Sequence, residues 1–154
     1  MNTDEIVFKI NNTDNKMIFL TGIFEGFSSY NLAIDNNYSY LDFNSFLKEN
    51  RIDSEHFKSS DASRTTGIII SIDQWTQKTA YKEQKATIII DGFDPKKIPD
   101  LLTKSLLMQD LLYLSKNNAK LKANLVFIID EKNGALEEQI LPKILTNSHI
   151  INLA

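Results

Sequence analysis

The sequence predicts a single α/β domain of three layers over residues 1–154, with a mostly parallel sheet preceded by an N-terminal hairpin. The run 86–90 is continuously apolar, as in parallel strands that helices cover on both faces, and the run 123–129 predicts another buried strand. Between them, residues 99–117 carry a leucine stripe broad enough to be buried on a sheet. From residue 66 onward strands and helices alternate, which implies crossover connections between parallel strands.

The first 50 residues predict the hairpin, followed by a short strand and a helix. Residues 6–10 and 17–20 are short apolar runs, and the segment between them is rich in asparagine and aspartate. Those residue types favour turns, so the two runs fit the strands of a hairpin. Residues 41–43 indicate a third, short strand, and residues 46–50 a helix.

The later elements follow from apolar runs and prolines. The β-branched run 67–72 predicts a strand, and residues 149–153 predict the last strand. Pro99 fits the first position of the long helix, where a missing N–H costs nothing. Residues 136–145 have a helical period, although Pro142 within them should break or bend the helix.

Composition narrows the classes of function. The net charge is −3 and the pI is near 5.4, which disfavours a general nucleic-acid binder because such proteins need a dense basic face. A local basic group at Lys116, Lys120 and Lys122 fits a solvated helix end better than a binding patch. The chain has no cysteine, which excludes disulfides, thiolate metal sites and cysteine nucleophiles.

The sequence also bears on location and origin. The N-terminus is acidic and polar, unlike a signal peptide, and no apolar run approaches the roughly 20 residues of a membrane helix. We therefore expect a cytoplasmic protein with no membrane partner. Lysine far outnumbers arginine, and asparagine and isoleucine are abundant, a bias typical of AT-rich bacterial or phage genes.

Residues 17–33 have the outline of a phosphate-binding loop. An apolar run leads into Gly22, Gly26 follows, and Ser28 precedes residues that could open a helix. Such loops read G-x-x-x-x-G-K-[ST], because backbone N–H groups cradle phosphate and the lysine reaches the outer phosphates. Without a gap, Ser28 takes the lysine position and Phe27 that of the second glycine. With a one-residue deletion Gly26 fits, but Phe27 takes the lysine position, so the lysine is missing in either alignment.

Two aspartates follow predicted strands and are candidate metal ligands. Asp91 and Asp130 lie beyond the carboxyl ends of apolar runs, where open α/β sheets place their ligands. Residues 88–91 have the form of the acidic motif that holds Mg²⁺ in phosphate-loop ATPases. The alternative is structural, since aspartates at strand ends also start turns and cap helices.

Together these segments resemble the core of a phosphate-loop NTPase of the additional-strand class, which includes the AAA and FtsK-like motor ATPases. Residues 6–33 look like its hairpin and phosphate loop, and residues 86–91 look like its Mg²⁺-binding strand. Residues 111–129 are similar to the helix and sensor strand that follow. The positions that match the family pattern are Gly22, Gly26, Ser28 and Asp91.

The resemblance implies binding of a nucleotide with Mg²⁺, yet the chain departs from the pattern at the positions that do the chemistry. Besides the missing lysine, Glu25 puts a negative charge where phosphate would sit, and Gly92 stands where many such ATPases have a catalytic glutamate. We therefore expect no ATPase activity and a nucleotide affinity weaker than millimolar.

Other catalytic patterns are weaker still. Asp73 with Glu83 and Lys85 has a spacing seen in Mg²⁺-dependent nucleases, but the last two precede the apolar strand instead of lying in it. The two histidines, His56 and His149, lack any zinc-ligand spacing.

Aromatic residues suggest a contact surface. Phe24 and Phe27 lie in the loop, and Trp75 precedes a polar segment, 76–85, that fits either a short helix or a loop. Exposed aromatic side chains often carry the binding energy of protein contacts. An equally good expectation is that these rings fold back as a small satellite core.

The interpretation that fits best is a non-catalytic protein-binding or regulatory module on a degenerate phosphate-loop NTPase-like scaffold, with no required cofactor. The first alternative is a nucleotide-binding protein that uses backbone N–H groups and Asp91, with weak binding of Mg²⁺ or nucleotide. The second is a Mg²⁺-dependent nuclease. A protein partner is expected, and nucleic acid is not.

Overall fold

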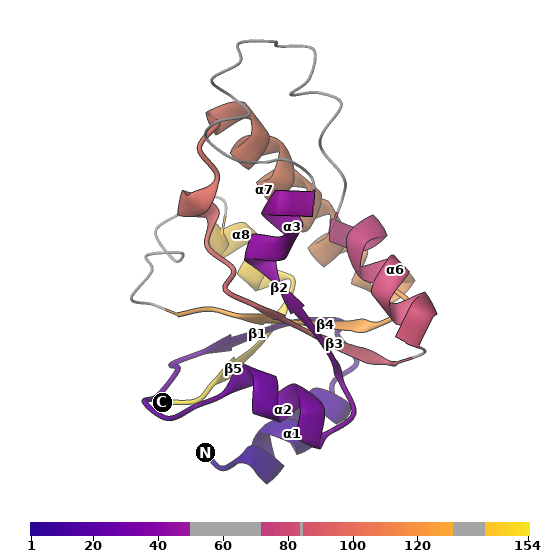
Figure 1. The fold of residues 1–154 in the computed structure, drawn as a ribbon, viewed down its shortest axis with the longest axis vertical. Coiled ribbons are helices and arrows are strands. Elements are labelled where there is room, and N and C mark those ends of the chain that lie inside the picture. The colour runs from indigo at the N-terminus through magenta and orange to yellow at the C-terminus, as the bar shows by residue number, and fades with distance from the viewer. Residues whose placement is uncertain (50–71, 84, 131–140) are drawn as a thin grey trace.

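One all-parallel sheet organises the molecule. The computed structural model describes residues 1–49, 72–83, 85–130 and 141–154 of the chain. Within them five strands pair in the order β2-β3-β4-β1-β5 (Figure 1). Their bounds are Met17–Thr21 for β1, Ser39–Asp42 for β2, Thr87–Asp91 for β3, Asn124–Ile128 for β4 and His149–Asn152 for β5. The prediction that residues 86–90 and 124–129 share a sheet is confirmed, because β3 pairs directly with β4.

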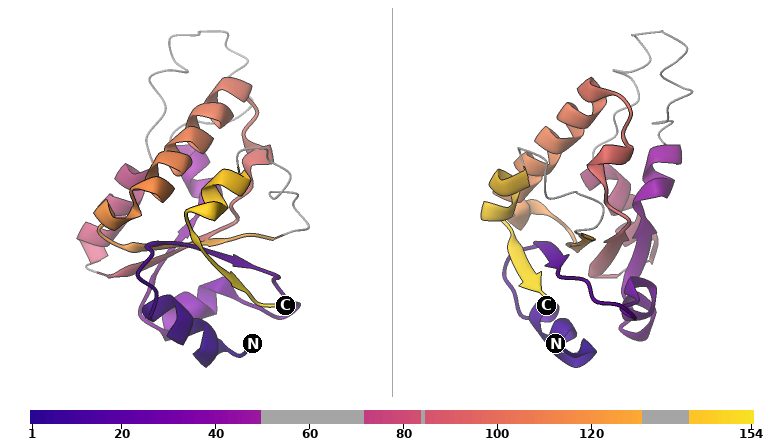
Figure 2. Two further views of the ribbon diagram at one scale, coloured as in Figure 1. Left: turned by 180° about the vertical axis from the view of Figure 1, so that it is seen from behind. Right: turned by 90° about the vertical axis from the view of Figure 1, so that its left-hand side faces the viewer.

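Helices cover both faces of this sheet, which confirms a three-layer α/β arrangement. One face carries α1 and α2, and the other carries α3, α6, α7 and α8 (Figures 1 and 2). The bounds are Thr3–Asn11 for α1, Ser29–Asp35 for α2, Phe43–Glu49 for α3, Ile72–Glu83 for α6, Leu101–Lys116 for α7 and Leu141–Thr146 for α8. Among the described helices, none combines the length and the apolar character needed to cross a bilayer.

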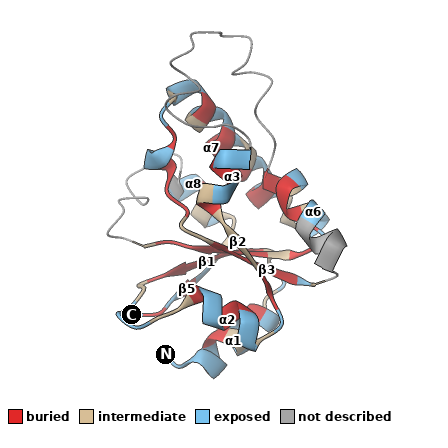
Figure 3. Ribbon diagram, in the orientation of Figure 1, coloured by how far each residue is buried: buried red, intermediate tan, exposed pale blue. Residues whose placement is uncertain are grey.

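The three inner strands are buried on both faces, as their continuous apolar runs predict (Figure 3). Alternate side chains point to opposite faces and join two separate cores. Phe19, Ile88 and Phe127 pack under α3, α6 and α7, while Ile89 and Val126 pack under α1 and α2. The long helix α7 contributes its own apolar side chains to the first core, so its predicted packing on the sheet is confirmed.

The predicted N-terminal hairpin is wrong, because residues 3–11 form α1 instead of a strand. The side chain of Asn2 caps this helix by accepting a hydrogen bond from the Glu5 N–H at 2.9 Å. Ile6 and Ile10 lie one turn apart and are both buried in the core under the sheet. A cap followed by apolar residues four apart is a helix signal, and it outweighs the local strand propensity of this short run.

Three further predictions need correction or lie outside the described residues. Of the predicted strand 67–72, residues 67–71 are not described, and Ile72 begins α6 instead. Asp100 caps α7 by accepting from the Thr103 N–H at 2.9 Å, so Pro99 precedes the helix. Of the predicted helix 136–145, residues 136–140 lie outside the described residues, and Pro142 is the second residue of α8 as described, in its first turn.

The parallel arrangement brings five strand ends to one edge of the sheet. The strands β1, β2, β3 and β5 end at Thr21, Asp42, Asp91 and Asn152, and Asp130 follows two residues after β4. Because every strand points the same way, these polar side chains gather at the carboxyl edge. Open parallel sheets bind their ligands at this edge.

Candidate functional site

The loop that follows β1 begins with a glycine that no other residue could replace without strain. Gly22 has a positive φ of 66°, and a Cβ there would lie 2.3 Å from Asn152 Oδ1 and 2.7 Å from the Ala154 backbone nitrogen. The segment after β5 is held against this turn, because the Leu153 N–H donates to the Thr21 carbonyl at 2.8 Å. Gly22 therefore lets two chain segments meet at the edge of the sheet.

The rest of the loop is a turn that leads into α2. Gly26 has a φ of 89° and open space around it, so it requires glycine for conformation alone. The Phe27 N–H donates to the Phe24 carbonyl at 3.1 Å, which closes the turn. Ser28 caps α2 by accepting from the Asn31 N–H at 3.1 Å. Gly22, Gly26 and Ser28 thus have structural roles of their own in this loop.

Asp91, at the end of β3, is held by three donors that carry no charge. Its Oδ2 accepts from the Ser29 hydroxyl at 2.7 Å and from the Tyr40 hydroxyl at 2.5 Å. Its Oδ1 accepts from the Gly92 N–H at 2.9 Å. Burial raises the pKa of Tyr40, and the hydrogen bond to the Asp91 carboxylate raises it further. Tyr40 is therefore a fixed donor to Asp91 at neutral pH.

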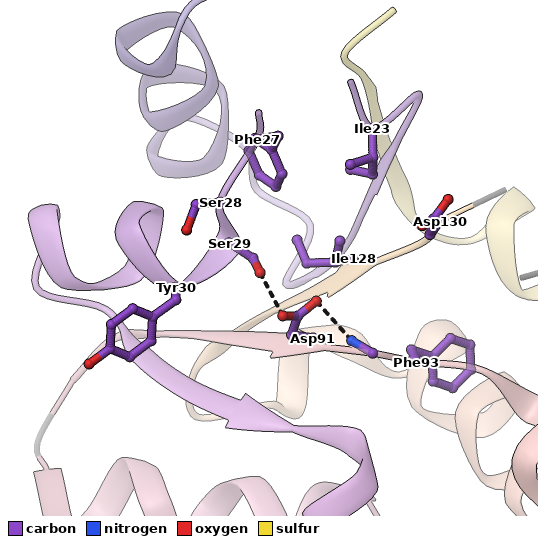
Figure 4. Close-up of a pocket in the computed structure, with 10 residues that line it drawn as sticks. Ile23, Phe27, Ser28, Ser29, Tyr30, Asp91, Phe93, Ile128 and Asp130 are labelled. Atoms are coloured by element: carbon purple, nitrogen blue, oxygen red, sulfur yellow. Dashed lines mark hydrogen bonds between the residues drawn. The ribbon is translucent and has the colours of Figure 1, made fainter. Parts of the chain in front are cut away.

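A cleft of about 350 Å³ opens beside this network. Its lining includes Ile23, Phe27, Ser29, Asp91, Ile128 and Asp130. In Figure 4 the two aspartates lie on either side of Ile128, and Ile23 and Phe27 approach from the loop side. The structure therefore brings Asp91 and Asp130 to one cleft with the loop, as the strand-end pattern predicts.

The charged side chains in the described lining of the cleft are acidic. None of the described residues that line it is lysine, arginine or histidine. Nor do the described residues contain a group of three or more histidine, aspartate or glutamate side chains placed to hold a metal ion. The phosphate chain of a nucleoside triphosphate needs cationic compensation, which none of the described residues of the loop or of the cleft lining supplies.

Two residues of the site, Ser29 and Tyr40, are not among those that the sequence predicts. The signal for Ser29 was present, because the ungapped alignment of the loop places it at the Ser/Thr position of the phosphate-loop motif. Tyr40 comes from β2, whose pairing with β3 sets it beside Ile89. No sequence motif indicates that β2, which carries Tyr40, pairs with β3.

The three aromatic candidates have different environments. Phe24 is 45% exposed, whereas Phe27 is half-buried and packs against the core formed with α1 and α2. Their rings meet edge to face with centroids 5.6 Å apart. Phe24 thus fits a contact residue, and Phe27 fits the satellite-core interpretation.

The expectation that Trp75 lies in a loop and offers a contact surface is wrong. Trp75 lies in α6 and is 6% exposed. Its ring packs against Phe46 with centroids 5.0 Å apart, and its indole N–H donates to Glu49 Oε2 at 3.2 Å. In α6, Ile72, Trp75 and Thr76 are buried, so the Trp75 ring lies on the face of this helix that meets the core.

The structure does not assemble the nuclease pattern. Asp73 and Glu83 lie near opposite ends of α6, about 15 Å apart along the helix axis at 1.5 Å per residue. The Asp73 carboxylate accepts from the Gln77 amide on the same helix at 3.1 Å. Of the two histidines, His149 lies in β5, and His56 is outside the described residues.

Comparison with protein-family models, curated proteins and solved structures gave no match to this chain. Its function therefore has to be argued from the geometry of the cleft.

Proposed function

We propose that the protein is a non-catalytic protein-binding module on a degenerate phosphate-loop scaffold, and that the cleft at the carboxyl edge is its contact surface. One observation carries the proposal. The cleft keeps the position of a phosphate-loop site, but Asp91 and Asp130 line it and none of its described lining residues is cationic, while Phe24 is exposed on the adjoining loop. Such a surface repels phosphate and suits a protein.

Two features support a phosphate-loop ancestry for the scaffold. One strand, β4, lies between β1, which leads into the glycine loop, and β3, which ends in Asp91. An inserted strand between those two elements is the feature for which the additional-strand class is named. In addition, Ser29 donates to Asp91 at 2.7 Å, and a loop Ser/Thr with a strand-end Asp is the pair that holds Mg²⁺ in such ATPases.

The same Ser29–Asp91 pair favours a second candidate function, weak binding of a nucleotide through Mg²⁺. Mg²⁺ is commonly held by one or two carboxylates together with substrate phosphates, and it keeps several waters. Against this candidate stand the missing lysine, the negative charge of Glu25 on the loop and the absence of a glutamate after Asp91. The cleft volume also lies at the low end of the range for small-molecule sites.

Calorimetric titration with ATP and GTP, each with and without Mg²⁺, separates the two functions. We expect no heat of binding up to millimolar nucleotide and no phosphate release in a turnover assay. Micromolar binding of any nucleoside triphosphate would overturn the protein-binding proposal in favour of the second candidate. The Asp91→Asn variant is the matched control, because a genuine Mg²⁺-nucleotide site would lose affinity with it.

A further inference from the structure

We propose that β5, the outermost strand on one side of the sheet, pairs with the β5 strand of a second copy of the chain, so that two sheets join into one. This pairing does not depend on the proposed function, because no residue of β5 lines the cleft. Three properties of β5 lead to it: backbone groups that point away from the sheet, an exposed side without protecting residues, and a register that complements itself.

The backbone of β5 has hydrogen-bonding groups on its outer side. Among the described strands, β5 pairs with β1 alone. The Leu153 N–H donates to the Thr21 carbonyl of β1 at 2.8 Å, and the residues that face a neighbouring strand alternate along a parallel pair. Ile151 therefore faces β1 as Leu153 does, while the N–H and C=O groups of Ile150 and Asn152 point outward. Within the described part of the chain, no group is bonded to these outward backbone atoms.

The two outermost strands of the sheet differ in exposure. In β2, on the other side, every residue is buried or half-buried. In β5, Ile150 is 46% exposed and Asn152 is also exposed (Figure 2, right). Strands at the side of a sheet are usually protected from pairing by charged residues, prolines or a covering element. β5 contains no proline, aspartate, glutamate, lysine or arginine, so its sequence leaves it open to pairing.

The outward groups of β5 complement themselves in one antiparallel register. With a two-fold axis at Ile151, Ile150 lies opposite Asn152 of the second copy, and Asn152 lies opposite Ile150 of the second copy. Residues that face each other in this way exchange both of their N–H···O=C hydrogen bonds. Every outward N–H and C=O of the two residues then has a partner, and the hydrogen bonds to β1 are undisturbed.

Side chains and charge favour a second copy as the occupant. Ile150 and its symmetry mate lie diagonally across the axis on the same face of the joined sheet, within reach of each other, so each covers apolar surface that is exposed in the single chain. His149 is the one titratable side chain of β5. It lies opposite Leu153 of the second copy, which keeps the two His149 rings at opposite ends of the pair. Like charges directly opposite would destabilise the pairing, and this register has none within β5.

Self-pairing leaves the cleft accessible. Because the two β5 strands run in opposite directions, the carboxyl edges of the two sheets point in opposite directions as well. Each copy then presents its own cleft at a separate end of the joined sheet. Dimerisation through β5 and binding of a partner at the cleft are therefore separable by mutation.

The test is the oligomeric state of the full chain, measured by sedimentation velocity. We expect a reversible dimer with a dissociation constant on the order of 100 µM, because one short strand makes a smaller contact than a stable dimer has. Samples from about 10 µM to about 1 mM span this constant. Over the same range, hydrogen exchange of the Ile150 and Asn152 amides should slow, since both N–H groups become hydrogen-bonded in the dimer.

Variants of Ile150 locate the contact. Ile150→Lys brings like charges together across the axis and should abolish the dimer. Its matched control is Ile34→Lys on α2, where the isoleucine is 55% exposed and the dimer should be unchanged. Ile150→Pro removes an outward N–H but none that faces β1, and should weaken the dimer about tenfold or more. Ile150→Ala keeps that N–H and should weaken the dimer less.

Three results would overturn the pairing of β5. They are a chain that stays monomeric at about 1 mM, a dimer that survives Ile150→Lys, and a dimer that Ile34→Lys abolishes as well. Thermal melts establish that each variant is folded, and Ile150→Lys decides the test if Ile150→Pro folds poorly. Failure of the dimer would leave the protein-binding proposal standing, since nucleotide titration tests that proposal separately.

Discussion

The two edges of the sheet use their polar side chains in opposite ways. At the amino edge, asparagine side chains form hydrogen bonds between the segments that lead into the strands. Asn15 accepts from the Met17 N–H at 2.9 Å and donates to the Asn147 carbonyl at 2.8 Å. The Asn118 side chain accepts from the Lys16 N–H at 3.2 Å. At the carboxyl edge, Asp91 and Asp130 instead line an open cleft.

The difference shows which edge serves stability and which serves binding. These asparagine side chains carry no charge, and their printed bonds join backbone groups of separate connections. Asp91 is instead held by neutral donors and lines a cleft that is open to a partner. The amino edge should therefore respond to mutation through the free energy of unfolding, and the cleft should respond through binding. Three substitutions test this comparison, from the largest expected effect to the smallest.

The largest effect should come from Gly22→Ala, because the carboxyl edge also has one purely structural position. The added Cβ would collide with Asn152 and the Ala154 backbone, and φ is 66°. We expect a loss of roughly 3 kcal/mol or more of unfolding free energy, measured by chemical denaturation. Gly26→Ala is the matched control. It carries only the left-handed strain, since nothing lies near its Cβ, and should cost about 1 kcal/mol. Equal losses in both variants would show that the close approach at Gly22 is unimportant.

At the amino edge, Asn15→Ala should cost about 2 kcal/mol of unfolding free energy, because two partly buried backbone groups lose their partner. Binding of a protein partner at the cleft should not change. Asn31→Ala is a suitable control, since this exposed asparagine takes part in the α2 cap only through its backbone N–H. Stability of Asn15→Ala within 0.5 kcal/mol of wild type, about the range of an ordinary surface substitution, would break the comparison.

The smallest effect on stability should come from Phe24→Ser, with a change below about 0.5 kcal/mol because the ring is 45% exposed. Proteins retained by the immobilised wild-type chain should be lost with this variant. The matched control is Phe8→Ser on α1, where another ring is exposed on a different element, and this variant should retain them. A loss of several kcal/mol for Phe24→Ser, or the same retained proteins for both variants, would remove Phe24 from the contact surface.

The sequence predicts the centre of this fold better than its margins. Continuous apolar runs such as 86–90 have one stable placement, between two layers of helices, so their strands are found correctly. Residues 3–11 form a short element at the periphery, where one cap and two buried isoleucines decide between helix and strand. Trp75 was misplaced for a related reason, because the burial of a polar helix face depends on contacts with Phe46 that the local sequence does not reveal.

The candidate site was predictable in part. Asp91 and Asp130 come from a general rule about strand ends, and the structure places both at one cleft. The rule does not identify the groups that donate hydrogen bonds to Asp91, since these depend on which strand lies next to β3. The neighbour is β2, and its Tyr40 supplies the second hydroxyl on Asp91.

The Tyr40 phenol also gives the protein a stability limit in alkaline solution. Its pKa is raised above the ordinary value of 10.0, first by burial and then by the Asp91 carboxylate. Above pH 10 the unfolded chain releases this proton while the folded chain still holds it, so unfolding becomes progressively easier as the pH rises toward the folded-state pKa. Tyr40→Phe removes the titrating group, and the unfolding free energy of this variant should therefore fall less steeply with alkaline pH than that of wild type.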